Sequence, residues 1–260
     1  MSEHFKHCLN NLSNGNNISF DDMSSLMNEL MTGSFTPAQI ASILISIKIK
    51  GESIDEITGA ASVMREHSNK VKIKDTNHLI DTCGTGGDSL QTFNVSTMSA
   101  IIAAAAGVKV AKHGGRSVSS KCGSADVLEA LGVNVNLNNL EIAAIVNKIG
   151  IGFMFAPNYH PAMKYVAPIR KDLGVRTIFN LLGPLTNPAS AKQQILGVYH
   201  KSLTNVLARV LEKLGSTHVM VVSGEDGMDE ISITGKTFVA ELKGNVIKEY
   251  IINPGDYGLP

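Results

Sequence analysis

Residues 79–97 read LIDTCGTGGDSLQTFNVST, in which a short apolar segment, a glycine-rich loop and a polar turn follow one another. A run of small apolar residues from Ser99 to Ala106 comes next and predicts a helix. The order strand, glycine-rich loop, helix brings a backbone close to an anion, because glycines lack Cβ atoms and the first helical N–H groups carry partial positive charge. Asn94, Ser96 and Thr97 stand just before the predicted helix, and their hydroxyl and amide groups favour an anion site over a plain turn.

The glycine-rich loop itself excludes two common nucleotide sites. GTGGD at residues 84–88 matches neither G-x-G-x-x-G nor the Walker pattern with its lysine. Because those patterns supply the close approach and the charge that dinucleotides and nucleoside triphosphates need, their fingerprints are absent here. A phosphate group of another kind is the remaining hypothesis.

The composition indicates an ordinary globular protein. The chain has 260 residues, 43% of them hydrophobic, and a formal net charge of zero, which gives no electrostatic argument for binding nucleic acid or a membrane. Cys8, Cys83 and Cys122 show neither metal-ligand spacing nor an even disulfide framework, so we expect a cytoplasmic location. The first thirty residues contain no signal-peptide pattern, and the apolar run at 101–108 is too short to span a bilayer.

Residues 1–70 are predicted to form an all-helical domain. Ser19, Thr36-Pro37 and Ser53 each begin an amphipathic helix, because their side chains suit the N-cap position. The second of these helices ends at Gly51 and carries Ile45 and Ile49 beyond its core positions. A helix that is apolar on more than one side is buried on more than one side. We therefore expect another domain or a second subunit to cover this helix, with a dimer surface favoured.

Residues 75–260 are predicted to form a larger α/β domain, because strand-like runs alternate with helical patterns. This order predicts a mainly parallel sheet flanked by helices, with strands at 108–111, 151–156, 194–199 and 218–222. The segment 237–252 predicts an antiparallel hairpin at one edge. Part of 161–185 is helical again and is expected to pack back on the N-terminal helices.

Three polar groups follow predicted strands, where ligands bind in sheets of this type. The first is the glycine-rich loop. The second, from Lys112 to Ser120, combines two cations, two glycines and several hydroxyls that can surround a phosphate. The third, from Ser223 to Glu230, holds four carboxylates, and oxygen ligands suit Mg²⁺ together with substrate phosphates. Together these groups predict a site for a magnesium–diphosphate.

Seven blocks in collinear order resemble one family. GTGGD is followed by NVST, then KHGxRSVSS, then GSADVLEALG at 123–132; FAPxYHPAMK at 155–164, RTIFNLLGPLTNP at 176–188 and GMDE at 227–230 complete the series. The pattern closely resembles the anthranilate phosphoribosyltransferases of tryptophan biosynthesis. The resemblance implies a small helical domain, a large α/β domain, a homodimer formed through the helical part, and a requirement for Mg²⁺.

The resemblance also implies roles for particular residues. The residues that would hold 5-phosphoribosyl 1-diphosphate (PRPP) are Gly84, Thr85, Gly86, Gly87, Asp88, Thr92, Asn94, Val95, Ser96, Thr97, Lys112, His113, Gly114, Gly115, Arg116, Ser117, Val118, Ser119, Ser120 and Ser124. Those that would meet anthranilate are Gly84, His113, Gly115 and Arg170, the last through its carboxylate-binding guanidinium. Those that would serve the metal are Ser96, Asp229 and Glu230. The aromatic amine is already nucleophilic, so no catalytic base is assigned.

The chain departs from the family pattern in three places. Gly115 stands where members usually have Asn, and Ser223 where many have His. Members also run on beyond the predicted hairpin, whereas this sequence ends at Pro260, so we expect a domain truncated at its C-terminus. Two alternatives therefore stay open: a pyrimidine nucleoside phosphorylase, and a non-catalytic homologue that binds PRPP. Retention of Asp229-Glu230 argues against the phosphorylase, which needs no such metal pair.

Overall fold

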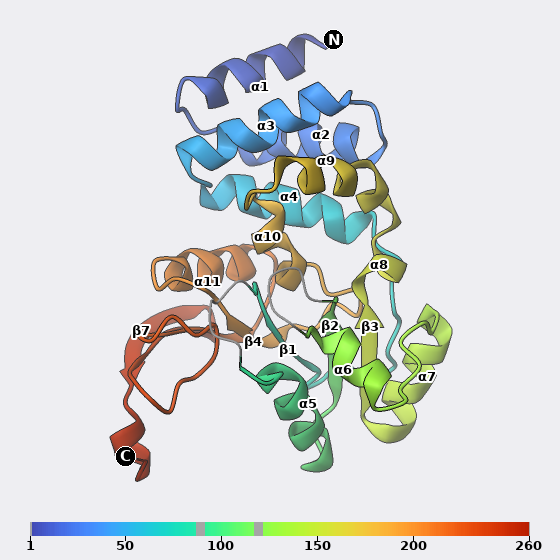
Figure 1. The fold of residues 1–260 in the computed structure, drawn as a ribbon, viewed down its shortest axis with the longest axis vertical. Coiled ribbons are helices and arrows are strands. Elements are labelled where there is room, and N and C mark those ends of the chain that lie inside the picture. Colours follow the sequence, from blue (N-terminus) through green and yellow to red (C-terminus); the bar gives the residue numbers. More distant parts are fainter. Residues whose placement is uncertain (1, 87–91, 117–121, 260) are drawn as a thin grey trace. The chain divides into compact units, whose positions relative to one another are not determined.

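The computed structural model describes residues 2–86, 92–116 and 122–259, which fall into two compact units (Figure 1). The helical unit comprises Met1–Asn69 and His160–Thr186, and the α/β unit comprises Lys70–Tyr159 and Asn187–Pro260. The chain thus leaves the helical unit, returns to it once, and leaves it again.

The helical unit begins with four helices whose starts follow from the sequence. They are α1 (Glu3–Ser13), α2 (Phe20–Met31), α3 (Pro37–Lys50) and α4 (Ile54–Glu66). Ser19, Thr36 and Ser53 cap α2, α3 and α4 as predicted, since each side chain accepts a backbone N–H bond from the first turn. The returning segment adds shorter pieces, namely η1 (Pro161–Tyr165), α9 (Ala167–Leu173), α10 (Phe179–Leu182) and η2 (Gly183–Leu185).

Helix α3 is apolar beyond its buried face, as its sequence predicts. Ile40, Ile43, Leu44 and Ile47 are buried in the helical unit. Ile49 is 80% exposed, although it is as apolar as they are. The described residues therefore leave Ile49 uncovered.

The α/β unit contains a seven-stranded sheet in the order β3-β2-β1-β4-β5-β6-β7. The strands are β1 (Ile80–Gly84), β2 (Val110–Gly114), β3 (Ile151–Phe155), β4 (Gln193–Gly197), β5 (His218–Gly224), β6 (Thr237–Lys243) and β7 (Val246–Ile252). Strands β1 to β5 pair in parallel, while β6 and β7 form an antiparallel hairpin at the edge. The prediction of a mainly parallel sheet with an edge hairpin is confirmed.

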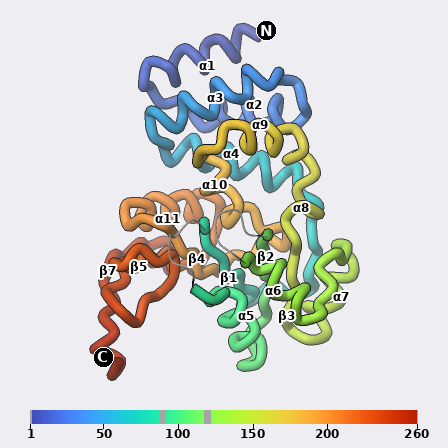
Figure 2. The backbone as a smooth tube through the Cα atoms, in the orientation of Figure 1, coloured from blue at the N-terminus to red at the C-terminus, as the bar shows by residue number. Residues whose placement is uncertain are grey.

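Helices pack along this sheet (Figure 2). Helix α5 (Val95–Ala105) packs against β1 and β2, α7 (Asn139–Ile149) against β3, and α11 (Leu203–Lys213) against β5 and β6. The remaining elements are α6 (Ser124–Ala130), α8 (Ala156–Tyr159) and η3 (Pro254–Tyr257). None of the helices in the described residues is both long enough and apolar enough to cross a bilayer.

Several predicted boundaries are wrong, and two of these errors matter most for the site. Strand β2 covers Val110–Gly114 instead of 108–111, so Lys112 and His113 lie inside a strand and not in a loop. Strand β2 pairs with β3 over its whole length, which gives Lys112 and His113 partners in the sheet. This pairing outweighs the low preference of polar residues for strands. Helix α5 begins at Val95 instead of Ser99, so Ser96 and Thr97 belong to its first turn.

Candidate active site

The order of the strands reverses at β1. The chain runs from β1 outward to β2 and β3, then crosses back so that β4 pairs with the other side of β1. In open parallel sheets, the crevice beyond the carboxyl ends of the strands at such a reversal is where ligands bind. Here those ends are Gly84 of β1 and Gly197 of β4, which are register partners.

Asp229, from the loop after β5, packs directly against Gly84 and Gly197. The backbone N–H of Gly86 donates to Asp229 Oδ2 at 3.0 Å. A Cβ atom on Gly84 would lie 2.7 Å from the same oxygen, and a Cβ atom on Gly197 would overlap the Asp229 carbonyl oxygen. Two glycines are therefore needed so that a carboxylate can reach the end of the sheet. The side chain of Asp229 is nearly buried there.

Glu230 reaches the first turn of α5. Its Oε1 accepts a hydrogen bond from the backbone N–H of Ser96 at 3.2 Å. Asn94, at the N-cap position, makes no side-chain cap bond, so the carboxylate of Glu230 serves an N–H group that the helix leaves without an internal partner. Negative charge at a helix N-terminus is favourable because of the helix dipole. The structure thus brings together Ser96, Asp229 and Glu230, the three residues predicted to serve the metal.

Lys112 lies beneath this cluster and is almost fully buried. Its ammonium group donates to the carbonyl of Thr82 and, at 3.1 Å, to Ser96 Oγ. Burial lowers the pKa of Lys112, while the nearby carboxylates of Asp81 and Glu230 oppose that shift. Lys112 therefore fixes the Ser96 hydroxyl and places a cation among the carboxylates.

Asp81 on β1 is a buried carboxylate whose charge acts on Lys112. It accepts from the backbone N–H of His113 at 3.1 Å and from Asn187 Nδ2 at 2.7 Å. Burial raises the pKa of Asp81, and the charge of Lys112 acts in the opposite direction. These bonds tie β1 to β2 and to the segment that precedes β4, so Asp81 positions the strands that carry the site.

Cys83 does not have the environment of a nucleophile. It is buried on β1 and receives a hydrogen bond from Gln194 Nε2 at 2.9 Å. Burial and the charge of Asp81 raise the pKa of its thiol well above the ordinary value. A reactive cysteine needs a lowered pKa and access to solvent. Cys83 is therefore a small core residue.

The other residues predicted for PRPP fall into two sets. Asn94 Nδ2 donates to the Cys122 carbonyl at 3.3 Å, and Thr97 Oγ1 donates to Ser124 Oγ at 3.0 Å, so the starts of α5 and α6 lie together. Val95 opens α5, Thr85 N donates to the carbonyl of Gly197, and Thr92 is exposed. Gly87, Asp88, Ser117, Val118, Ser119 and Ser120 lie outside the described residues.

Three residues at the end of β2 have distinct surroundings. A Cβ atom on Gly114 would lie 3.2 Å from the Phe153 ring, so this glycine serves packing. Among the described residues, no atom lies within 4 Å of a Cβ built on Gly115, so these residues leave room there for the usual Asn of the family. Arg116 forms ion pairs with Asp126 and Glu129, which already compensate its charge, and its phosphate role stays a prediction.

The predicted anthranilate residues belong to both units. Gly84, His113 and Gly115 lie in the α/β unit, where His113 is buried. Arg170 lies on α9 of the helical unit, and its guanidinium carbon is 5.4 Å from the centre of the Phe179 ring. Partial burial lowers the pKa of Arg170. Its stacked position holds the guanidinium in one orientation, which suits recognition of a planar carboxylate.

Gly197, Asn187 and Asp81 belong to the site but were not predicted as site residues from the sequence. A glycine inside a predicted strand signals a close approach of another chain segment, and Gly197 carried that signal. An acidic residue within a buried apolar strand, as at Asp81, signals a hydrogen-bonded network because a buried charge needs partners. Asn187 gave no local signal, since its two bonds, to Asp81 and to the Ala111 carbonyl, exist only in the folded chain.

Two family models match nearly the whole chain. The glycosyl transferase family helical bundle domain matches residues 6–68, and the glycosyl transferase family a/b domain matches residues 76–260. The fold and the site thus define a two-domain glycosyl transferase. The anthranilate phosphoribosyltransferase of Laribacter hongkongensis is 57% identical over 97% of this chain and 74% of its own length. The chain belongs to the anthranilate phosphoribosyltransferase family.

Solved structures agree with this membership. The anthranilate phosphoribosyltransferase of Thermus thermophilus is similar with a TM-score of 0.89 and 41% identity, covering 97% of this chain and 74% of that one. The Saccharomyces cerevisiae enzyme, solved in complex with PRPP and Mg, is similar with a TM-score of 0.87 and 31% identity, covering 99% and 75%. The present chain therefore spans about three quarters of the length of these relatives.

Proposed function

We propose that this chain transfers the phosphoribosyl group of PRPP to the amine of anthranilate, giving N-(5-phosphoribosyl)anthranilate and diphosphate in tryptophan biosynthesis. The observation that supports this most directly is the pair Asp229-Glu230 at the reversal point of the sheet. Asp229 is held there by Gly86, and Glu230 by the first turn of α5. These contacts place carboxylates beside a helix N-terminus, a combination suited to a metal-bound diphosphate.

The reaction breaks the bond between ribose C1 and the diphosphate oxygen and forms a bond between C1 and the anthranilate nitrogen. The departing oxygen keeps the electron pair of the broken bond, and the nitrogen loses a proton. Negative charge therefore grows on the diphosphate while positive charge grows on the ribose. Fixed charges and dipoles aimed at the diphosphate lower the barrier, because they need not reorganise during the reaction. Among the residues that the structure describes, Lys112 and the N-terminal backbone N–H groups of α5 can stabilise the charge on the diphosphate.

The residues at the site fit a magnesium ion. Asp229, Glu230 and the Ser96 hydroxyl offer oxygen atoms only, which is the donor set that Mg²⁺ prefers. Glu230 Oε1 accepts from the backbone N–H of Ser96, and the hydroxyl of the same residue is held by Lys112, so both candidate ligands stand at the first turn of α5. When bound, Mg²⁺ supplies positive charge that offsets the charge of the diphosphate.

The acceptor side of the proposal rests on four residues. Gly84, His113 and Gly115 would border anthranilate from the α/β unit, and Arg170 would bind its carboxylate from the helical unit. The stacked Arg170 guanidinium supports its role, because a planar fork of donors matches a carboxylate. The open space at Gly115 leaves room for an acceptor where relatives usually carry a side chain. Positioning of the two substrates would then account for much of the acceleration.

An activity assay tests the proposal against both alternatives. We expect the protein, mixed with Mg²⁺, PRPP and anthranilate, to consume anthranilate, which is followed by the loss of its fluorescence. Omission of Mg²⁺ is expected to stop the reaction. Cleavage of thymidine or uridine with inorganic phosphate would instead indicate a nucleoside phosphorylase, and PRPP binding without turnover would indicate a non-catalytic homologue. Either result would contradict the proposed transferase.

We also propose a cytoplasmic location and a homodimer formed through the N-terminal helices. None of the three cysteines of the chain is in a disulfide in the described structure, which agrees with a reducing compartment. Cell fractionation with an antibody to the chain tests the location.

The dimer is supported by Ile49 on α3, because an isoleucine exposed to 80% gains from being covered.

Substitution of Ile49 by aspartate is expected to weaken the dimer at least tenfold. Covering an isoleucine side chain stabilises a contact by about 1.5–3 kcal/mol, and a carboxylate in its place adds a desolvation cost. Sedimentation measured over a range of concentrations reports the change in dissociation constant. Leu140→Asp is the matched control, since Leu140 is 77% exposed on α7 of the other unit. Equal dissociation constants for parent and Ile49→Asp would refute this surface.

A further inference from the structure

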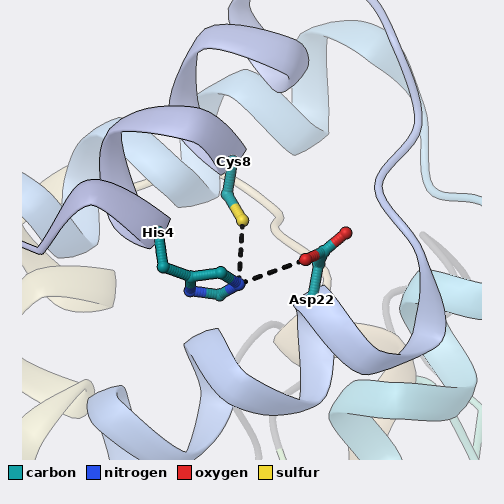
Figure 3. Close-up of side chains that lie close together, drawn as sticks. All are labelled: His4, Cys8 and Asp22. Atoms are coloured by element: carbon teal, nitrogen blue, oxygen red, sulfur yellow. Dashed lines mark hydrogen bonds and ion pairs between the residues drawn. The ribbon is translucent and has the colours of Figure 1, made fainter.

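A cluster of three metal-ligand types lies at the start of the helical unit (Figure 3). His4 and Cys8 are four residues apart on α1, so their side chains share one face of the helix. Asp22 reaches them from the first turn of α2. His4 Nε2 lies 3.5 Å from Cys8 Sγ and 3.2 Å from Asp22 Oδ1. All three candidate ligand atoms lie within 4.8 Å of one another.

These distances are close to those of a tetrahedral zinc site. Zinc binds nitrogen, oxygen and sulfur ligands at about 2.0–2.3 Å, so two ligands of one ion lie roughly 3.3–3.8 Å apart. The His4–Cys8 distance of 3.5 Å falls in that range, and the His4–Asp22 distance of 3.2 Å is just below it. Cys8 Sγ and Asp22 Oδ1 also lie within 4.8 Å of each other, so the three ligand atoms converge on one point.

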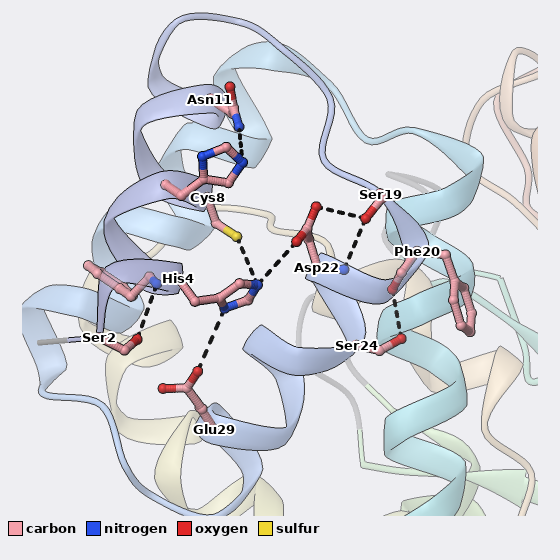
Figure 4. A network of polar contacts seen from close by, with 11 residues as sticks. Ser2, His4, Cys8, Asn11, Ser19, Phe20, Asp22, Ser24 and Glu29 are labelled. Atoms are coloured by element: carbon pink, nitrogen blue, oxygen red, sulfur yellow. Dashed lines mark hydrogen bonds and ion pairs between the residues drawn. The ribbon is translucent and has the colours of Figure 1, made fainter.

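The surroundings of the cluster supply outer contacts for two of the three ligands, His4 and Asp22 (Figure 4). His4 Nδ1 faces Glu29 Oε1 at 3.8 Å, on the side away from the other two ligands. A metal-binding histidine commonly donates its second ring N–H to a carboxylate, which fixes the ring. Asp22 Oδ2 accepts from the Ser19 hydroxyl at 2.7 Å, while Oδ1 points to His4. His4 and Asp22 thus each face a second partner, while Cys8 is enclosed by the core of the helical unit.

The charges of the cluster favour a cation. The carboxylates of Asp22 and Glu29 both lie beside His4, at 3.2 and 3.8 Å from its ring nitrogens, and their negative charge attracts a cation. A bound divalent ion would displace the proton of the Cys8 thiol, because a coordinating thiol is deprotonated. The side chains of His4 and Asp22 are 33% and 32% exposed, so water can complete the fourth position. Cys8 itself is buried, which protects a metal–sulfur bond.

We propose that His4, Cys8 and Asp22 bind a zinc-type divalent ion that links α1 to α2. The ligand set of one thiolate, one imidazole and one carboxylate suits zinc and disfavours Mg²⁺, which prefers oxygen ligands. This site is separate in the chain from the carboxylates of the α/β unit and does not depend on the proposed function. The spacing of the three cysteines gave no sign of a metal site in the sequence. The sequence feature that does indicate this site is the four-residue spacing between His4 and Cys8.

Cobalt(II) is the probe for this site, because a thiolate bound to cobalt gives a charge-transfer absorption band. We expect one equivalent of Co²⁺ to produce this band in the full chain and Zn²⁺ to abolish it. Cys8→Ser should lose the band, while Cys122→Ser, which removes an exposed thiol, should keep it. Zn²⁺ should raise the melting temperature of the parent and of Cys122→Ser, but not of Cys8→Ser.

Asp22→Asn provides a second variant that preserves the shape of the side chain. We expect it to bind Co²⁺ at least tenfold more weakly with an unchanged circular dichroism spectrum, and Glu29→Gln to bind about tenfold more weakly. His7→Asn, on the same helix but outside the cluster, should bind with parental affinity. The proposal is overturned if saturating Co²⁺ gives no thiolate band, if Cys8→Ser keeps the band, or if Asp22→Asn binds as tightly as the parent.

Discussion

Replacement of Gly197 by alanine is expected to lower the rate of anthranilate consumption on the order of 100-fold. The added Cβ would overlap the carbonyl oxygen of Asp229, so the backbone of the 229–230 segment must move. A misplacement of about 1 Å in a site can cost on the order of 100-fold in rate, because the reaction depends on position. The Gly86–Asp229 bond and the Ser96–Glu230 bond would both be disturbed. Initial rates with saturating PRPP and Mg²⁺ measure the effect.

Gly235→Ala is the matched control for Gly197→Ala. Its added Cβ would make an ordinary contact of 3.8 Å with Glu225, and its backbone needs no left-handed conformation. We expect its rate to stay within about twofold of the parent, since surface changes of this kind have small effects. Circular dichroism establishes that both variants are folded. A Gly197→Ala variant with the parental rate would show that the position of Asp229 over β4 is not needed for the reaction.

The double substitution Asp229→Asn with Glu230→Gln is expected to abolish Mg²⁺-dependent turnover and to leave the fold intact. Amide side chains have the shape of the carboxylates and can still accept from the backbone N–H groups of Gly86 and Ser96. They lack the charge that holds a divalent ion beside a diphosphate. Loss of one fixed electrostatic group costs about 10²–10³ in kcat, so loss of two should leave no measurable rate. A magnesium titration of the rate is the measurement.

Glu225→Gln serves as the control for charge, because Glu225 is an exposed acid of the same segment. Its variant should show the parental magnesium dependence. Asp226 is unsuitable for this purpose, since its Oδ2 accepts from the hydroxyls of Ser232 and Thr234 and it holds the loop. Parental rates in the double variant, at every magnesium concentration, would remove Asp229 and Glu230 from the site.

The helix starts and the strand-and-helix order were predictable because their signals are local. A side-chain cap acts over three residues, as Ser53 and Glu56 show, and apolar runs reveal strands whatever their partners are. The family motifs added residue roles that no local pattern contains. In contrast, the start of α5 was predicted four residues too late. Its first turn is completed by Glu230, a residue 134 positions away in the chain.

The sequence by itself determined the helical N-terminal segment, the mainly parallel sheet with its edge hairpin, and the family. These follow from periodicity, capping and motif order, which are properties of neighbouring residues. The tertiary structure alone decided that Lys112 lies inside β2 under Ser96, that Asp229 rests over Gly84 and Gly197, and that His4 and Cys8 meet Asp22. Such contacts join distant segments, and their geometry exists only when the packed backbone brings those segments together.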